Sequence, residues 1–161
     1  MIIREAKLTD AAAIAFVHYD SWQTTYRGLL PDDYIDKRLY EKHKNHWENS
    51  LGKSTEKETN YVTYVAENPD REIAGFIDGG LERSNNSSYQ GEIYALYILE
   101  DYQRQGIGRN LVQQTASQLS QSDLTSILVW VLKDNSAVKF YQTLGFQEVI
   151  VKKIALILNK L

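Results

Sequence analysis

The feature that most constrains this chain is a strand, a glycine-bearing turn and a helix that follow one another over residues 91–119. Residues 92–99 are rich in Ile, Tyr and Leu, which favour a strand, and apolar residues recur at helical spacing from Ile107 onward. The turn between them, residues 103–108, reads Gln-Arg-Gln-Gly-Ile-Gly. Glycines let a backbone approach a ligand closely, and the free N–H groups at a helix start favour an anion. This combination predicts a phosphate-binding turn.

The spacing of the two glycines excludes two common phosphate sites. A P-loop needs Gly-Lys followed by Ser or Thr, and no such sequence follows these glycines. A dinucleotide fingerprint needs a small residue three places after Gly108, where Leu111 stands instead. What remains is Gln103-x-x-Gly106-x-Gly108. In this position, between a strand and a helix, it resembles the acetyl-CoA pyrophosphate loop of the GNAT N-acetyltransferase superfamily.

Length and composition restrict the class of protein. With 161 residues, 43% of them hydrophobic and 24% charged, the chain is predicted to form a single domain over residues 1–161. It contains no cysteine, which excludes a disulfide framework, a thiol nucleophile and a thiolate metal site. The net charge of −3 argues against a nucleic-acid partner. Without a signal pattern or an apolar run of roughly 20 residues, we expect a cytoplasmic protein that does not contact a membrane.

The rest of the chain predicts alternating strands and helices around this central stretch. Expected strands cover residues 1–6, 61–66, 72–79, 92–99, 127–132, 146–151 and 154–158. Gly75 and the Gly79-Gly80 pair suggest a bulge or bend in the third of them. Expected helices begin at residues 9–10, 31, 107 and 135, and the second of them runs to about residue 47. Residues 51–60 are expected to form a solvated loop. The apolar run 127–132 does not alternate, which predicts a strand beside the central one and covered on both faces.

A second motif extends the resemblance to nearly the whole chain. Residues 135–146 read Asn-Ser-Ala-Val-Lys-Phe-Tyr-Gln-Thr-Leu-Gly-Phe. This segment follows the expected strand 127–132, and it resembles the second GNAT motif, which follows the corresponding strand of that family. The resemblance implies a mixed α/β (α+β) fold. Its central sheet is mostly antiparallel, splayed at the cofactor site and flanked by helices on both faces. It also implies transfer of an acetyl group from acetyl-CoA to a primary amine, by direct attack in a ternary complex and without a metal.

The resemblance assigns the cofactor residues position by position. Three central-strand residues would follow the pantetheine arm, with the N–H of Ile98 as donor to the thioester oxygen. The arginines of the turn either add charge or are only solvated, and Asn135 can both contact the cofactor and cap a helix. The complete set of expected CoA-binding residues is Tyr97, Ile98, Leu99, Gln103, Arg104, Gly106, Ile107, Gly108, Arg109, Asn135 and Tyr141.

Two residues are candidates for proton transfer. Tyr141 occupies the position of a family tyrosine near the CoA sulfur, suited to protonating the leaving thiolate. Its spacing from Val138 and Leu144 equally suits a core aromatic. Glu92 lies on the central strand where some family members carry a general base, and it is therefore a candidate for both catalysis and substrate binding. A solvated strand glutamate is the alternative, because the amine can also lose its proton to water.

The acceptor side is less well defined by the sequence. Trp22 and Tyr26 match the part of the fold that lines the acceptor cleft, and they fit core or rim packing equally well. His43 and His46 lack further ligands nearby, so they are predicted to be surface histidines and not a metal site. The acceptor stays open between a small-molecule amine and a peptide N-terminus.

The C-terminus departs from the family pattern. Residues 146–161 leave room for only a shortened or altered final hairpin. Its last strand could therefore pair within the chain or with a second subunit, which raises a homodimer as one alternative. A non-catalytic acyl-CoA-binding or protein-interaction module on the same fold is the competing hypothesis for the function.

Overall fold

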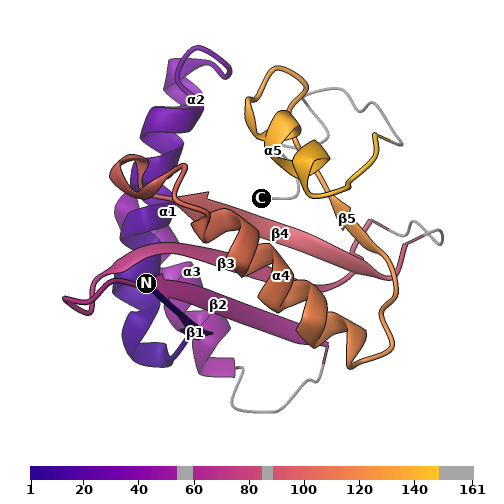
Figure 1. The fold of residues 1–161 in the computed structure, drawn as a ribbon. Coiled ribbons are helices and arrows are strands. Elements are labelled where there is room, and N and C mark those ends of the chain that lie inside the picture. Colours follow the sequence, from indigo (N-terminus) through magenta and orange to yellow (C-terminus); the bar gives the residue numbers. More distant parts are fainter. Residues whose placement is uncertain (54–59, 85–88, 149–161) are drawn as a thin grey trace.

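The computed structural model describes residues 1–53, 60–84 and 89–148. Its elements follow the order of the chain shown in Figure 1. Two short 3-10 helices, η1 (Leu8–Asp10) and η2 (Glu100–Tyr102), precede α1 and α4. The strands and α-helices are β1 (Ile2–Glu5), α1 (Ala11–Thr25), α2 (Asp32–Asp36), α3 (Tyr40–Lys53), β2 (Tyr61–Glu67), β3 (Ile73–Leu81), β4 (Gly91–Ile98), α4 (Ile107–Ser120), β5 (Ile127–Val129) and α5 (Ala137–Thr143).

The five strands form one sheet in the order β1-β2-β3-β4-β5. The first four are antiparallel, and β5 runs parallel to β4. The pairing of β4 with β5 reaches only from Gly91 to Ile93, whereas β4 continues to Ile98. No other described strand pairs with the remaining edge of β4. The predicted mostly antiparallel sheet, splayed beside the central strand, is therefore confirmed.

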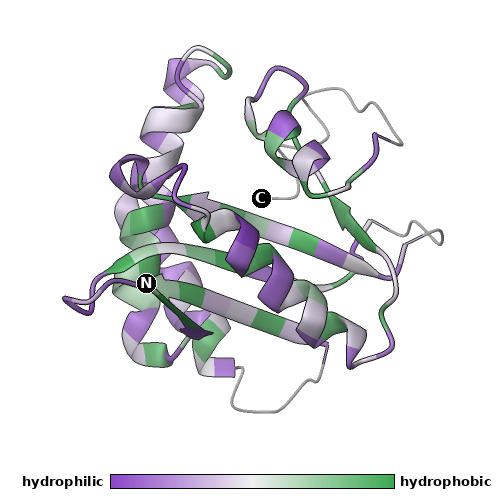
Figure 2. Cartoon of the chain, in the orientation of Figure 1, coloured by the Kyte–Doolittle hydropathy of each residue, from purple (hydrophilic) through white to green (hydrophobic). Residues whose placement is uncertain are grey.

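Helices cover both faces of this sheet, as predicted (Figure 1). One core cluster joins α1 and α3 to sheet residues such as Val65, Phe76 and Tyr97. The other joins α4 and α5 to residues of the opposite face, among them Ile77 and Ile93. Figure 2 shows the hydrophobic residues along the strands and on the helix sides that face them. The two cores fix which side chains of β4 point toward α1 and which toward α4.

The helix expected from residue 31 to about residue 47 is interrupted. It divides into α2 and α3, which are separated by residues 37–39. The N–H of Arg38 donates to the carbonyl of Ile35, and its guanidinium lies over the ring of Trp22, 4.6 Å from the centroid. This contact with α1 belongs to the tertiary structure, so helical periodicity alone could not reveal the break.

Other boundaries also differ from the expectations. The strand expected over residues 127–132 lies beside β4 as predicted, but it ends at Val129, and both Ile127 and Val129 are only half-buried. It is thus not covered on both faces by the described residues. Helix α3 extends to Lys53, and residues 54–59 of the expected loop lie outside the described residues. The last expected strands fall mostly on residues 149–161, which also lie outside, and residues 146–148 form no strand.

The bend predicted near Gly79 coincides with a register shift between Asp78 and Gly79, where Asp78 lies opposite Ala95 and Gly79 opposite Ile93. This extra residue in β4 changes which face its first residues point to. No described helix is both long and apolar enough to span a membrane.

Candidate functional site

The turn after β4 is held against the strand by its own glutamine. The side-chain amide of Gln103 donates to the carbonyl of Ile98 over 3.0 Å. Gly106 then adopts a left-handed φ of 81° as the N-cap of α4, which begins at Ile107. Arg104 also has a positive φ, 61°, a conformation that few non-glycine residues adopt. The turn therefore places the start of α4 directly beside the end of β4.

The two glycines of the turn serve different purposes. A side chain at Gly106 would have no atom within 4 Å, so the space beside it is open and only its φ requires glycine. At Gly108, an added Cβ would lie 3.0 Å from the ring of Phe140 and 3.3 Å from Ile98. Gly108 thus lets α4, α5 and β4 approach one another closely.

The open edge of β4 carries free backbone groups. The N–H of Leu99, just after β4, donates to the carbonyl of Ala74 in β3 over 2.9 Å. Because backbone groups of an antiparallel strand point alternately to its two neighbours, the N–H of Ile98 points away from β3 and into the gap next to β5. The end of β4 can therefore pair with an extended ligand.

A cavity of about 880 Å³ fills this gap. It brings together twelve of the residues predicted from the sequence, and Leu99 and Glu92 are the two that do not line it. The residues that line it as predicted are Trp22, Tyr26, Tyr97, Ile98, Gln103, Arg104, Gly106, Ile107, Gly108, Arg109, Asn135 and Tyr141.

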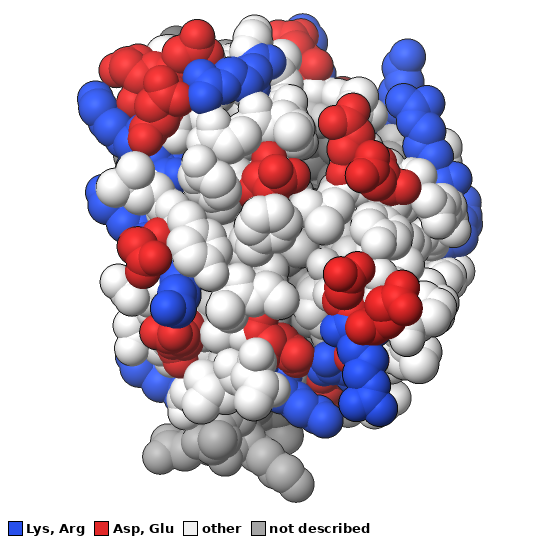
Figure 3. Space-filling view, turned by 90° about the vertical axis from the view of Figure 1, so that its left-hand side faces the viewer, with Lys and Arg blue, Asp and Glu red and all other residues white. Residues whose placement is uncertain are grey.

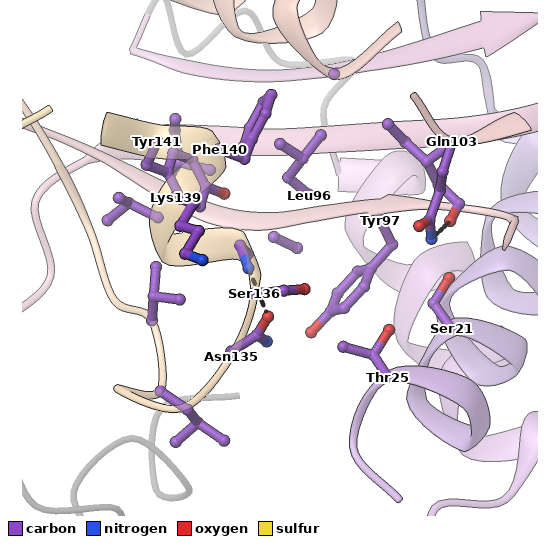
Figure 4. Close-up of a pocket in the computed structure, with 18 of the residues that line it drawn as sticks. Ser21, Thr25, Leu96, Tyr97, Gln103, Asn135, Ser136, Lys139, Phe140 and Tyr141 are labelled. Atoms are coloured by element: carbon purple, nitrogen blue, oxygen red, sulfur yellow. Dashed lines mark hydrogen bonds between the residues drawn. The ribbon is translucent and has the colours of Figure 1, made fainter. Parts of the chain in front are cut away.

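The cavity passes from one face of the sheet to the other. One wall consists of α1 residues, and the opposite wall consists of the start of α4 and of α5. These helices lie on opposite faces of the sheet (Figure 1). In Figure 4, Tyr97 lies between the two walls, with these labelled side chains around it: Ser21 and Thr25 from α1, and Lys139, Phe140 and Tyr141 from α5. Two ligands can therefore reach the same gap from opposite faces.

A hydrogen-bonded trio of aromatic side chains joins the α1 wall to Tyr97 of β4. The indole N–H of Trp22 donates to the hydroxyl of Tyr97 over 3.0 Å. The hydroxyl of Tyr26 lies 3.2 Å from the same oxygen. Burial raises the pKa of Tyr26, and burial together with the neighbouring Tyr26 raises the pKa of Tyr97 well above its ordinary value. Both phenols are therefore protonated at neutral pH.

The α5 wall contributes Tyr141 and Asn135. Tyr141 is 8% exposed, and its ring packs edge-on against Phe140 and Phe146. Burial raises the pKa of Tyr141 far above neutrality, so its hydroxyl is protonated at pH 7 and does not act as a base there. The side-chain oxygen of Asn135 accepts the N–H of Ala137, the first residue of α5, over 2.9 Å, but the N-cap position is Ser136 and not Asn135 as expected.

The structure does not bring Glu92 to the cavity. Its side chain is 2% exposed and accepts the backbone N–H of Arg83 over 2.9 Å, with the Arg83 guanidinium at 3.3 Å. Glu92 lies where β4 is still paired with β5, opposite Leu128, and therefore outside the gap; the register shift beside Gly79 sets the face to which its side chain points. Leu99, the other exception, uses its N–H in pairing with Ala74 and packs toward the α1 core.

The expectation of two surface histidines was wrong for His43. This side chain is 7% exposed, and its ring lies 4.2 Å from that of His18. Burial lowers the pKa of His43 to about 4, so it is neutral at pH 7. His46 is exposed, as expected.

Several cavity residues were not predicted. Ser21 and Thr25 lie one helical turn apart on α1, next to the predicted Trp22 and Tyr26. That spacing was a usable signal, since residues four apart share a helix face. Leu96 could have been predicted, because it lies two residues before Ile98 and so on the same face of the strand. Lys139 could not, because its place in the cavity depends on the orientation of α5, which the sequence does not indicate.

Charge is unevenly distributed around the cavity. Among the described residues that line it, the charged ones are all basic: Arg104, Arg109 and Lys139. They lie on the turn, α4 and α5, opposite the uncharged α1 wall. On the outer face shown in Figure 3, acidic and basic side chains are interspersed. The basic character is therefore concentrated where an anionic ligand would meet the start of α4.

Known proteins are similar to this chain in sequence and in fold. The family model described as an acetyltransferase (GNAT) domain matches residues 31–154. An uncharacterized N-acetyltransferase, YuaI of Bacillus subtilis, is 39% identical over 140 residues, which cover 87% of this chain and 76% of that protein. A spermidine N(1)-acetyltransferase of Thermoplasma acidophilum is 24% identical, over 90% of this chain and 87% of the relative.

A solved structure agrees with the fold. The crystal structure of the PaiA N-acetyltransferase from Thermoplasma acidophilum, in complex with coenzyme A, superposes with a TM-score of 0.79. It is 21% identical in sequence, and the match covers 95% of this chain and 92% of that one. The family model matches most of the chain, and the Bacillus subtilis relative is 39% identical to it. The chain therefore belongs to the GNAT acetyltransferase family and is an N-acetyltransferase.

Proposed function

We propose that the protein transfers the acetyl group of acetyl-CoA to a primary amine of a small molecule, by direct attack in a ternary complex. The observation that carries this proposal is the cavity that crosses the sheet between β4 and β5. A donor entering beside α4 and an acceptor entering beside α1 would meet at the open edge of β4. No covalent acetyl-enzyme is then required.

The donor would bind along the turn and the open strand edge. The N–H groups at the start of α4 would surround the pyrophosphate, and Arg104 and Arg109 would add positive charge. The pantetheine arm would extend β4 as a further strand. The N–H of Ile98 would then donate to the thioester oxygen, where negative charge develops during attack.

The proton balance follows from the groups that line the cavity. The amine nitrogen forms a bond to the carbonyl carbon, the carbon–sulfur bond breaks, and the thiolate takes the proton of Tyr141. Water receives the proton lost by the amine, since no carboxylate is found among the described lining residues, and the phenol regains its proton from water. The products are the acetylated amine and CoA with a free thiol.

The relatives support a small-molecule acceptor, because one is named for spermidine, a small amine. The test combines the purified protein with acetyl-CoA and a panel of primary amines, and measures release of the CoA thiol. We expect release that depends on the amine, with initial-rate lines that intersect when both substrates are varied. CoA binding without thiol release on any amine would instead support the non-catalytic module, and parallel lines would indicate a covalent intermediate.

A further inference from the structure

The trio on the α1 wall leaves one hydroxyl proton unused. The indole of Trp22 can only donate, and it donates to the oxygen of Tyr97. The hydroxyls of Tyr97 and Tyr26 share a single hydrogen bond, in which either can be the donor. Two hydroxyl protons and one shared bond leave one O–H free, whichever tyrosine carries it. Both tyrosines line the cavity, so this donor is available to a ligand.

A second hydroxyl on the same wall has no partner. Ser21 is 3% exposed, and its Oγ makes no hydrogen bond to the described residues. Ser21 lines the cavity one helical turn before Thr25 (Figure 4). A buried hydroxyl without a partner lowers stability, so such a group in a cavity wall points to a bound ligand as its partner.

The surroundings of these hydroxyls disfavour a second positive charge on the ligand. The raised pKa values of Tyr26 and Tyr97 keep both phenols neutral. The guanidinium of Arg38 lies over the Trp22 ring, 4.6 Å from its centroid, and would repel an additional ammonium group. The described lining of the cavity contains no carboxylate that could offset this repulsion. The wall is therefore suited to a neutral hydrogen-bond acceptor.

We propose that the α1 wall binds a neutral oxygen of the acceptor, a hydroxyl, ether or amide oxygen close to the reacting amine, through the free O–H of the tyrosine pair and the Ser21 hydroxyl. The acceptor is thus an amine with a neighbouring neutral oxygen, not a simple diamine. This inference rests on the proposed amine acetylation and defines its substrate class.

The test uses two matched pairs of acceptors: ethanolamine with propylamine, and methoxyethylamine with butylamine. In each pair an oxygen replaces a carbon. The measured quantity is the selectivity ratio, kcat/KM for the oxygen-containing amine divided by that for its alkyl partner. This ratio does not depend on the active fraction of a preparation. Comparing it between wild type and variant cancels the difference in amine basicity.

The count of hydroxyl protons predicts a non-additive result. Tyr26→Phe and Tyr97→Phe each leave one free O–H, so each alone should change the ratio by less than about twofold. The double variant removes the donor and should lower the ratio about fivefold, the loss typical of one neutral hydrogen bond. Ser21→Ala should lower it similarly while unfolding at the same or a higher temperature, because it removes an unpaired buried hydroxyl. Tyr19→Phe, on the same helix but outside the cavity, is the matched control and should retain the wild-type ratio.

Two results would overturn the inference: a double variant that keeps the wild-type ratio, or single variants that lose as much as the double one. Wild-type preference for propanediamine over ethanolamine at equal free-base concentration would also contradict it. If the amines are acetylated but the ratio never changes, only this inference fails. If no amine is acetylated although CoA binds, the proposed function fails and this inference with it.

Discussion

Tyr141 is the residue whose surroundings most directly suit a step of the reaction. It is buried between Phe140 and Phe146, and this burial raises its pKa, so the phenol carries its proton at neutral pH. It can therefore donate this proton to the thiolate as the carbon–sulfur bond breaks, and the resulting phenolate, which is the stronger base of the two, is reprotonated by water. We expect Tyr141→Phe to lower kcat about a hundredfold, within the usual range for loss of a general acid, with the acetyl-CoA KM nearly unchanged.

Steady-state kinetics on the best amine of the panel measure this effect, and Tyr19→Phe serves again as the control for a tyrosine outside the cavity. An unchanged kcat would remove Tyr141 from proton transfer and leave it as a core aromatic. A change in KM alone would assign it to cofactor binding.

For Glu92, in contrast to Tyr141, we predict no part in proton transfer. Its carboxylate is buried against Arg83 and does not line the cavity, so it should affect stability and not the proton balance. We expect Glu92→Gln to leave the acidic limb of the pH–rate profile of kcat/KM in place. The free energy of unfolding should fall by about 1–2 kcal/mol, because a charged hydrogen bond becomes a neutral one. A shift of the acidic limb in this variant would restore Glu92 as a base.

At the residue scale, the sequence was informative where the backbone itself makes the site. Gly106 and Gly108 are required by a positive φ and a close contact, and both requirements leave a trace in the sequence. The hydrogen bond from Trp22 to Tyr97 joins residues 75 positions apart, and no local sequence pattern indicates it. The direction of Glu92 depended on a single extra residue in β4, which reverses the alternation on which a strand prediction relies.

At the element scale, the turn before α4 offers a matched pair of glycines. Gly106 and Gly28 have nearly equal positive φ values, 81° and 79°, and neither has an atom within 4 Å of an added Cβ. Only Gly106 lines the cavity. Alanine at either position should therefore cost about 1 kcal/mol of stability through backbone strain.

The two variants should differ in CoA binding. We expect Gly106→Ala to weaken the affinity for CoA, because its methyl group would occupy open space beside the start of α4, and Gly28→Ala to leave it unchanged. Isothermal titration of CoA, alongside urea unfolding, measures both effects. Equal CoA affinity in the two variants would argue against a pyrophosphate at this turn.

Elements were predictable from the sequence where local chemistry determines them. Helix α4 begins where the glycines and apolar spacing indicated. The break between α2 and α3 lies instead at the contact of Arg38 with Trp22, and β5 ends at Val129 although β4 continues to Ile98. Such boundaries are set by tertiary contacts that no local pattern records.

At the scale of the whole molecule, the buried histidines and the buried Asp78 have opposite effects on stability as the pH falls. Burial lowers the pKa of His43 to about 4 and that of His18 well below its usual value. Stability from these histidines is fully present above about pH 6.5 and is lost as the pH falls, because the unfolded chain takes up protons first. Burial raises the pKa of Asp78 to about 6, so its folded state takes up a proton first and gains stability over part of the same range.

The two histidines outnumber Asp78, so the free energy of unfolding should fall between about pH 6.5 and pH 4, with a net slope on the order of 1 kcal/mol per pH unit. Asp78→Asn should make this loss steeper, because it removes the opposing proton uptake. His43→Phe should make it shallower and also raise stability at neutral pH, since Nε2 of His43 is buried without a hydrogen-bond partner among the described residues. Urea unfolding of the three proteins at a series of pH values measures the slopes. Parallel slopes would mean that neither group changes its protonation on unfolding, and that the acid sensitivity of this fold has another origin.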